Sequence, residues 1–215
     1  INLRGIKIDL DVVNGAIAIS EQVTAELTSE AVKLTGLANP NSVSQLRQWC
    51  EDELGRPVDN LQKASVDELL EEGELCPKVR RVLEIRQELS KTSVKKYTAM
   101  RDAVCDDGRV RGLLQFYGAN RTGRWAGRLV QVQNLPRNYI SSLNLARETV
   151  KRQDVNLLQF LYSNVSDTLS QLIRTALVPA EGCLLHIADY SAIEARVIAW
   201  LAGEQWRQEV FATHG

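Results

Sequence analysis

The residues best suited to chemistry lie near the C-terminus, where an acidic side chain and a hydroxyl group follow an apolar run. The run covers residues 183–188, and Asp189, Tyr190 and Ser191 come directly after it. The run predicts a strand, whose end fixes the backbone of Asp189 and releases its carboxylate into a cleft. Carboxylate oxygens are the hard ligands that magnesium prefers. The segment therefore predicts a place where a divalent metal ion lies beside a phosphate.

The residues of this segment also have a purely structural interpretation, as helix and turn caps. Ser191 and Glu194 stand three residues apart at the start of a helical pattern over residues 191–202, which is the spacing of a capping box. An Asp at the end of a strand, such as Asp189, can likewise cap the turn that follows it. Taken alone, these residues favour the capping interpretation.

A second candidate segment is the run Asn120-Arg121-Thr122-Gly123-Arg124. Three side-chain donors around a glycine allow guanidinium and backbone groups to approach a phosphate or a base edge together. Many surface loops have the same composition, so this run alone does not distinguish a nucleic-acid contact from an ordinary loop.

A third candidate segment carries Gln133 and Asn134 between apolar residues, followed by Pro136 and Arg137. Amide side chains both donate and accept hydrogen bonds, which suits contacts to sugars or to the minor groove. The alternative is ordinary turn chemistry, in which Asn134 bonds to its own backbone.

Charge is unevenly distributed, although the formal net charge is only −1. Residues 51–76 hold nine acidic and two basic side chains, whereas residues 78–137 hold fourteen basic and five acidic ones. Over residues 78–96 the charges suit the solvated face of a long helix. Residues 109–137 have no helical pattern, so there the basic excess favours a polyanionic partner.

Composition is that of an ordinary globular protein able to bury a sizeable core, with 215 residues, 44% apolar and 25% charged. The four cysteines are scattered, and neither His186 nor His214 completes a zinc site. We expect reduced thiols and a cytoplasmic location. No leader and no apolar run of the roughly 18 residues needed to span a bilayer is present, so no membrane partner is expected. A start at Ile1 and an end at Gly215 predict a fragment of a longer protein.

The elements that must position these residues are mostly helical. The periodicity predicts helices over residues 11–36, 42–55, 65–73, 77–100, 141–151, 155–162, 167–176 and 191–202. Asp11, Ser42 and Ser65 are the predicted caps of the first three, Gly36, Gly55 and Gly73 their predicted stops, and Pro77 suits the first turn of the fourth. Loose alternation over residues 109–119 predicts short strands. The predicted fold class is therefore α+β, mostly helical, with short antiparallel strands.

Together these segments resemble the motifs of family A DNA polymerases, the bacterial DNA polymerase I type, and in detail the phage-encoded branch. The motifs are Thr122-Gly123-Arg124, Gln133-Asn134-Leu135-Pro136 and the run Asp189-Tyr190-Ser191-Ala192-Ile193-Glu194-Ala195-Arg196, in this order. The last one, D-Y-S-x-I-E-x-R after an apolar run, is highly specific. Residues 5–9 also resemble the segment that leads into the family's thumb, so the resemblance covers nearly the whole chain.

The resemblance implies a helical thumb subdomain over residues 1–104 and the N-terminal part of a palm over residues 105–215. Residues 138–166 look like a helical insertion relative to the bacterial enzymes. The implied enzyme binds primer–template DNA in the cytoplasm of a bacterial host. It adds deoxynucleotides from deoxynucleoside triphosphates to the primer 3′ end by two-metal phosphoryl transfer, with Mg²⁺ as cofactor.

The resemblance also implies roles for single residues. Asp189 is the catalytic carboxylate that holds the metal ions, and the carbonyl of Tyr190 is a further ligand. Glu194 lies where a ribose 2′-hydroxyl would be, and Arg124 contacts the primer end. The DNA-binding set is Arg121, Thr122, Arg124, Gln133, Asn134 and Arg137.

The chain departs from the family pattern at several points. Arg121 stands where the family has a small residue, Trp125 follows where Ser or Thr is usual, and Ala192 replaces a common Gln. The spacing of Arg137 from the Gln-Asn pair is one residue shorter than in the bacterial pattern. No fingers helix and no second carboxylate motif is found, so we expect the 215-residue chain to be inactive alone. The alternatives are a non-catalytic helical nucleic-acid-binding module and a domain whose charge asymmetry mediates assembly.

Overall fold

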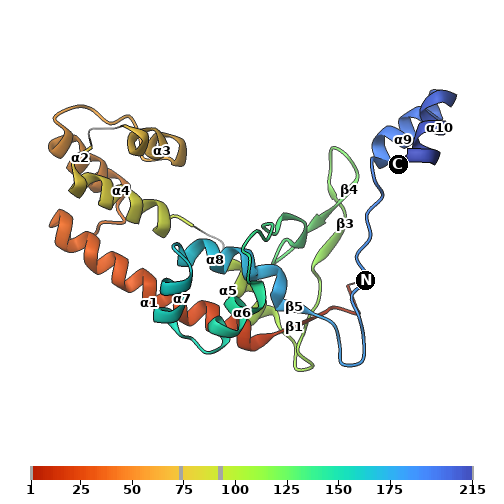
Figure 1. The fold of residues 1–215 in the computed structure, drawn as a ribbon, viewed down its shortest axis with the longest axis horizontal. Coiled ribbons are helices and arrows are strands. Elements are labelled where there is room, and N and C mark those ends of the chain that lie inside the picture. The colour runs from red at the N-terminus through yellow and green to blue at the C-terminus, as the bar shows by residue number, and fades with distance from the viewer. Residues whose placement is uncertain (1, 73–74, 92–93, 215) are drawn as a thin grey trace. The chain divides into compact units, whose positions relative to one another are not determined.

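The computed structural model describes residues 2–72, 75–91 and 94–214 and separates into two compact units, Ile1–Val178 and Pro179–Gly215 (Figure 1). The helices of the first unit are α1 (Leu10–Thr35), α2 (Val43–Leu54), α3 (Lys63–Glu71), α4 (Pro77–Leu89), α5 (Lys95–Ala103), α6 (Leu143–Lys151), α7 (Val155–Leu161) and α8 (Val165–Leu172), with 3-10 turns η1 (Val132–Asn134) and η2 (Ile173–Ala176). Its strands are β1 (Ile6–Ile8), β2 (Arg109–Val110), β3 (Leu114–Ala119), β4 (Arg124–Gly127) and β5 (Leu177–Val178). The second unit contains α9 (Ile193–Leu201) and α10 (Gln205–His214).

The predicted class is confirmed, because helices dominate the described residues and every strand pair there is antiparallel. The three-stranded sheet has the order β2-β1-β5, with Ile6 opposite Val110 and Lys7 opposite Val178. The strands predicted within residues 109–119 are present as β2 and β3. Strands β1 and β5 escaped prediction because two or three residues are too few to show alternation.

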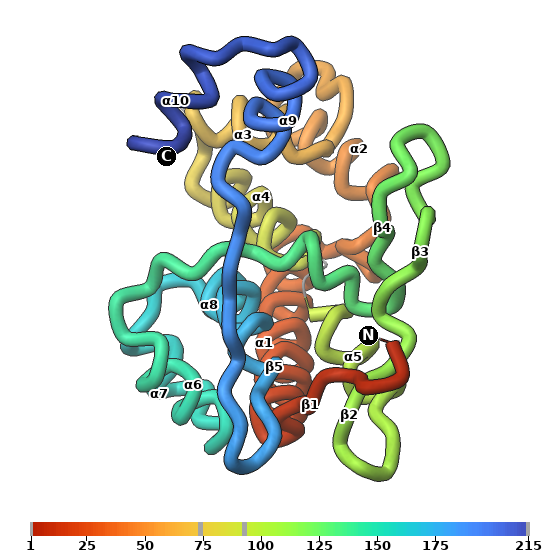
Figure 2. The backbone as a smooth tube through the Cα atoms, turned by 90° about the vertical axis from the view of Figure 1, so that its right-hand side faces the viewer, coloured from red at the N-terminus to blue at the C-terminus, as the bar shows by residue number. Residues whose placement is uncertain are grey.

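Helix α1 runs through the middle of the larger core (Figure 2). It packs against α4, α5, α6 and α8, so it is covered from several sides. The fully or nearly fully buried side chains on α1 include Val12, Val13, Ala16, Ile19 and Val23. Because Val12 and Val13 are adjacent and both buried, the apolar surface of α1 is wider than one stripe and accepts more than one neighbour.

A second hydrophobic cluster joins α2, α3 and α4 and includes Leu46, Trp49, Val66 and Leu83. The predicted stop at Gly55 is confirmed, since this residue ends α2 in the left-handed conformation with φ +65°. Helix α4 begins at Pro77 as predicted. The division predicted at residues 104–105 stays a prediction, and the larger core takes side chains from both sides of it.

Several predicted helix boundaries and capping bonds differ from the structure. Asp9, not Asp11, caps α1, and α3 is capped at Gln62 rather than at Ser65. Ser42 is the N-cap of α2, but its side chain makes no capping bond. The single helix predicted over residues 77–100 is two helices, with Ser90 as the C-cap of α4. Ser side chains compete for backbone groups, and the Ser90 hydroxyl donates to the Gln87 carbonyl at 2.8 Å where α4 ends. The predicted end at Gly73 lies outside the described residues.

Asp9 connects the start of α1 to α6. Its carboxylate accepts a hydrogen bond from the Val12 N–H at 3.3 Å and forms ion pairs with Arg147 and, at 3.0 Å, with Lys151. Burial alone would raise the pKa of Asp9. The Lys151 hydrogen bond, the Val12 N–H and the Arg147 charge act in the opposite direction, and the pKa is lowered overall.

The substitution Asp9→Asn tests this junction, because Asn retains a capping oxygen and loses the charge. A lowered pKa in the folded state means that ionised Asp9 stabilises the fold above its unfolded pKa of about 3.9. This stabilisation is lost as the pH falls through the folded pKa. We expect Asp9→Asn to lower the free energy of unfolding at pH 7 by about 1.5–3 kcal/mol, the range for hydrogen bonds to charged groups.

Urea unfolding at pH 7 and pH 3 measures the effect, with Asp9→Ala as the comparison that also removes the cap, at a further cost of about 1 kcal/mol. The difference between the original chain and Asp9→Asn should shrink at pH 3. A difference that stays constant between the two pH values would contradict the ionic contribution.

Candidate nucleic-acid interface

Strands β3 and β4 form a hairpin that carries Arg121, Thr122 and Arg124 at its tip (Figure 1). Ala119 pairs with Arg124, and the N–H groups of Thr122 and Gly123 both donate to the Ala119 carbonyl at 3.0 and 2.9 Å. These bonds close a tight turn. All three predicted side chains at the tip are exposed, so the structure brings them together on one accessible end of the first unit.

Gln133 and Asn134 lie on η1, and Gln133 reaches back to the hairpin. A Cβ atom placed on Gly127 would lie only 1.9 Å from Oε1 of Gln133. The side-chain amide therefore occupies the space that glycine leaves on β4. Gln133 and Asn134 are both exposed, and the Gln133 contact joins the η1 turn to the strand that follows the hairpin tip.

The backbone that carries Gln133 and Asn134 is held by Lys96 on α5. The Lys96 ammonium group donates to the carbonyls of Val130 at 3.1 Å and Asn134 at 3.2 Å. Burial lowers the pKa of Lys96. The ammonium group thus replaces the secondary-structure partners that these carbonyls lack.

Two residues of the α8–η2 segment hold the next part of the same loop. The Arg174 guanidinium donates to the Pro136 carbonyl at 2.8 Å and to the Leu135 carbonyl at 2.9 Å. Gln171, which is 1% exposed, accepts from the N–H groups of Tyr139 at 2.8 Å and Ile140 at 3.0 Å. The loop from η1 to α6 is thereby fixed without regular secondary structure.

Arg137 is exposed and makes no hydrogen bond or ion pair with the other residues that the structure describes. The positioning residues Lys96, Gln171 and Arg174 were not predicted. Of these three, only Gln171 could have been recognised from the sequence, because it is a polar residue on the apolar face of a helix.

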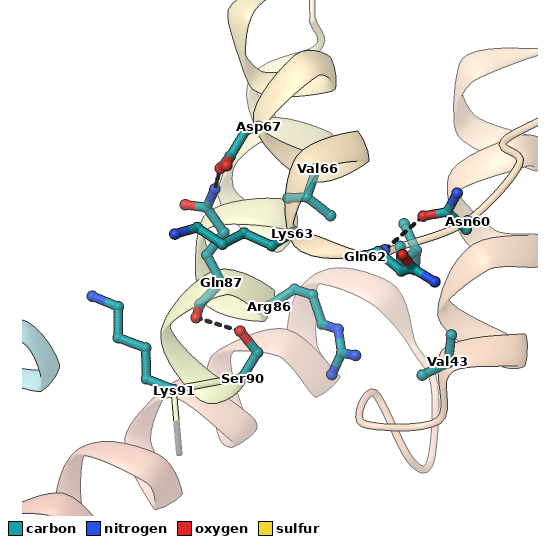
Figure 3. Close-up of a pocket in the computed structure, with 11 residues that line it drawn as sticks. Val43, Asn60, Gln62, Lys63, Val66, Asp67, Arg86, Gln87, Ser90 and Lys91 are labelled. Carbon is teal, nitrogen blue, oxygen red and sulfur yellow. Dashed lines mark hydrogen bonds between the residues drawn. The ribbon is translucent and has the colours of Figure 1, made fainter. Parts of the chain in front are cut away.

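A cavity of about 810 Å³ lies between α2, α3 and α4 in the helical part of the first unit (Figure 3). Lys63, Arg86 and Lys91 line it, and the Nε atom of Arg86 is buried without a hydrogen-bond partner among the described residues. The carboxylate of Asp67 in the wall already accepts from the Gln87 amide. Three cations beside one engaged carboxylate favour an anionic occupant.

In the second unit, the strand predicted over residues 183–188 is wrong. These residues form no ladder with any described segment, and Leu184 and Ile187 are 80% and 94% exposed. A strand requires a neighbour for its N–H and C=O groups, and the described chain supplies none here. Asp189 is consequently an exposed residue on irregular backbone ahead of α9.

The capping-box interpretation of Ser191 and Glu194 is also wrong. The N-cap of α9 is Ala192, at φ +51°, and no side chain caps this helix. Glu194 instead lies in the first turn, where a negative charge interacts favourably with the helix dipole.

Arg196 holds the turn that follows Asp189. Its Nε donates to the Ser191 carbonyl at 2.7 Å and its Nη1 to the Phe211 carbonyl at 3.0 Å. The guanidinium also lies over the Phe211 ring, 4.6 Å from the centroid. The Arg of the D-Y-S-x-I-E-x-R motif therefore joins the start of α9 to α10.

The metal ligands implied by the sequence are the carboxylate of Asp189 and the carbonyl of Tyr190. The Tyr190 carbonyl accepts from the Ile193 N–H at 3.3 Å and retains a second lone pair. Two oxygen donors suit a hard cation such as magnesium, which keeps several waters and binds through one or two carboxylates plus phosphates. Within the described parts of the chain, no three His, Cys, Asp or Glu side chains gather into a metal-binding cluster.

In the part of the chain that the structure describes, no helix has both the length and the apolar character to cross a bilayer.

A mostly helical chain with a basic hairpin, a Gln-Asn turn and an Asp-Tyr-Ser segment, in this order, has the pattern of a template-directed polymerase. Residues 13–215 match DNA polymerase family A, and the chain belongs to this family.

Similar proteins include phage and bacterial polymerases. The DNA polymerase of Bacillus phage SP02 is 58% identical over 215 residues, which are 100% of this chain and 33% of the relative. The thermostable DNA polymerase I of Thermus thermophilus is 31% identical over 208 residues, covering 90% of this chain and 21% of the relative. DNA polymerase I of Lactococcus lactis subsp. lactis is 27% identical over 218 residues, covering 99% and 21%. The chain thus spans a third or less of these relatives.

The clamp on the interface loop gives a prediction for Gln171. The substitution Gln171→Leu preserves the approximate volume but leaves the N–H groups of Tyr139 and Ile140 without an acceptor. We expect the free energy of unfolding to fall by about 1–3 kcal/mol, the desolvation cost of unsatisfied buried groups. We also expect faster hydrogen exchange at both amides.

Urea unfolding and hydrogen–deuterium exchange measure these two effects. Gln159→Leu is the matched control, because Gln159 is exposed on α7 and should change neither quantity appreciably. Unaltered protection of the Tyr139 and Ile140 amides in Gln171→Leu would disprove the clamp.

Proposed function

We propose that this chain is the part of a phage-type DNA polymerase that holds primer–template DNA and contributes one metal-binding carboxylate to the polymerisation site. The observation that supports the proposal most is the contact of Gln133 with Gly127, which joins the η1 turn to the basic hairpin. The family membership and the 58% identity to a phage polymerase support the proposed activity of the complete protein.

In the proposed DNA complex, the hairpin tip and the Gln-Asn turn contact the primer end and its minor groove. Arg124 donates to sugars, phosphates or base edges, while Arg121 and Thr122 contact the neighbouring backbone. Gln133 and Asn134 read the minor-groove acceptors that all base pairs share. Arg137 adds a phosphate contact at the end of the same surface. Such contacts are independent of sequence, as a replicative enzyme requires.

The helical part of the first unit would contribute phosphate contacts of its own. Lys63, Arg86 and Lys91 around the cavity in Figure 3 offer cations to the duplex backbone. This role agrees with the proposed assignment of residues 1–104 to a thumb and of residues 105–215, with an insertion over residues 138–166, to part of a palm.

Asp189 and the Tyr190 carbonyl would hold Mg²⁺, which when bound polarises the reacting phosphate and neutralises its charge. Glu194, five residues after Asp189 in sequence and in the first turn of α9, would exclude a ribose 2′-hydroxyl. Two metal ions need more than one carboxylate, and the chain spans only 33% of its phage relative. We propose that the other ligands come from elsewhere in the polymerase, which acts in the cytoplasm of a bacterial host.

Arg124→Ala tests the DNA-binding part of this proposal in the 215-residue chain. We expect affinity for a primer–template duplex to fall roughly 10- to 150-fold, the effect of losing one charged hydrogen bond of about 1.5–3 kcal/mol. If Arg124 contacts a phosphate, the slope of log affinity against log salt should also decrease by about 1. Fluorescence anisotropy over a salt series measures both.

Arg152→Ala is the control, because Arg152 is exposed at the end of α6, away from the hairpin in sequence. Equal affinities of Arg124→Ala and the original chain would refute the assigned contact. If the affinity for the duplex does not change with salt, phosphate contacts do not contribute to it. That result would favour a domain that mediates assembly.

Primer extension tests the catalytic part. In a complete polymerase containing this segment, Asp189→Asn should lower the rate by at least two to three orders of magnitude, roughly the effect of losing one group that stabilises the transition state. Primer–template affinity should persist. Glu194→Ala should retain extension and raise ribonucleotide incorporation.

The 215-residue chain by itself should show no primer extension with Mg²⁺ and deoxynucleotides. Extension by the isolated chain would contradict the proposal that further metal ligands come from elsewhere in the polymerase. Normal extension by Asp189→Asn would overturn the assigned metal site. Duplex binding with a fully active Asp189→Asn polymerase would leave only the non-catalytic binding role.

A further inference from the structure

Three aromatic side chains of the β3–β4 hairpin are exposed and adjacent to one another. Phe116, Tyr117 and Trp125 are 72%, 57% and 50% exposed. The Phe116 ring lies 5.3 Å from the Trp125 ring in an edge-to-face arrangement and 6.3 Å from the Tyr117 ring. Exposed aromatic side chains that gather in one place are typical of binding surfaces.

An irregularity in the strand pairing produces this cluster. Gln115 pairs with Ala126 and Ala119 pairs with Arg124, so three residues of β3 lie opposite the single residue Trp125 of β4. In a regular strand, the consecutive residues Phe116 and Tyr117 would point to opposite faces. The bulge brings their rings together instead, as bulges characteristically redirect side chains.

Tyr117 shows how the hairpin accommodates the bulge. Its φ is +52°, a conformation that a bulky residue rarely adopts. A Cβ atom on Gly123 would lie only 2.7 Å from the Tyr117 ring, so the ring packs over the glycine of the turn. The aromatic cluster is thus tied to the turn that positions Arg121 and Arg124.

The electrostatic surroundings of the cluster are entirely cationic in sequence. Residues 108–147 contain no Asp or Glu, and their charged residues are Arg109, Arg111, Arg121, Arg124, Arg128, Arg137 and Arg147. Arg109 and Arg111 pair with Asp107, and Arg147 pairs with Asp9. Arg121 and Arg128 are exposed, with no hydrogen bond or ion pair from their side chains to other described residues.

We propose that Phe116, Tyr117 and Trp125 form a stacking surface for unpaired nucleotides of DNA. Aromatic rings among arginines, with no carboxylate in the segment, match a ligand that combines flat π-surfaces with a negatively charged backbone. Paired bases inside a duplex are stacked on one another, so the rings select bases that are not paired. The arginines favour a negatively charged ligand over an uncharged one, and the exposed rings favour a ligand with flat π-surfaces.

The proposed stacking rests on the DNA-binding role of the same hairpin and adds a ligand class to it. Duplex contacts belong to Arg124 and to the Gln133 amide, whereas the rings act on the single-stranded part of the substrate. The hairpin would therefore bind a duplex with an unpaired extension more tightly than the same duplex with blunt ends.

Affinities of the 215-residue chain for two substrates test the inference. The first is a 20-base-pair blunt duplex, and the second is the same duplex with a single-stranded extension of ten thymidines. The double substitution Phe116→Ala, Trp125→Ala should weaken binding to the extended duplex roughly tenfold or more, given about 1–3 kcal/mol for each base stacked on an aromatic ring. Affinity for the blunt duplex should change less than about twofold.

The control Phe160→Ala removes an aromatic side chain that is 86% exposed on α7 and should leave both affinities unchanged. The double substitution Phe116→Tyr, Trp125→Phe keeps the rings and should retain the preference, which separates loss of stacking from loss of the hairpin. Quenching of Trp125 fluorescence by the extension is expected in the original chain.

The outcomes separate this inference from the proposed function. If neither duplex binds, the DNA-binding role fails. If both bind and Arg124→Ala weakens both, but the alanine pair keeps the preference for the extension, the stacking surface is refuted. Equal affinity of the original chain for the two substrates would refute it as well.

Discussion

The packing of α4, α5, α6 and α8 against α1 is the constraint on which the rest of the first unit depends. Lys96 on α5 and the Gln171–Arg174 segment after α8 satisfy the backbone of a loop that has almost no secondary structure of its own. Their reach is short, so the loop is fixed only while α5 and α8 hold their places on α1. The Asp9 junction adds a polar tie between α1 and α6. The geometry of the candidate interface therefore depends on the packing of α5 and α8 against α1.

The helices were predictable where local chemistry and tertiary packing agree. Gly55 and Pro77 mark boundaries because each has a backbone requirement that no neighbour alters. The strand predicted at residues 183–188 failed for the converse reason. An apolar run indicates that a segment is suited to burial. A strand forms only when another segment supplies hydrogen-bond partners. The short strands β1 and β5 were missed on the same principle, since pairing and not periodicity defines them.

The candidate site was predictable in its exposed residues and unpredictable in its support. Arg121, Arg124 and Gln133 were predicted from residue type and spacing, because their side chains carry the donors that suit contacts to nucleic acid. Lys96 and Arg174 bind backbone carbonyls 34 to 39 residues away, and a carbonyl has no identity in a sequence. The contact of Gln133 with Gly127 is intermediate. The glycine is visible, but its partner becomes evident only in three dimensions.

The candidate segments of the two units therefore differ in how each is held within its own unit. The hairpin and the η1 loop are fixed by ladder bonds, side-chain clamps and a ring packed on a turn. Asp189 follows exposed apolar backbone and is restrained only through the turn that Arg196 holds. A metal ligand must keep its position within a fraction of an ångström to be effective. A strand pairing with residues 183–188 would supply that restraint and cover Leu184 and Ile187. On the proposed assignment, the Asp-Tyr-Ser motif would supply the metal ligand, and a strand paired with residues 183–188 would hold its carboxylate in place.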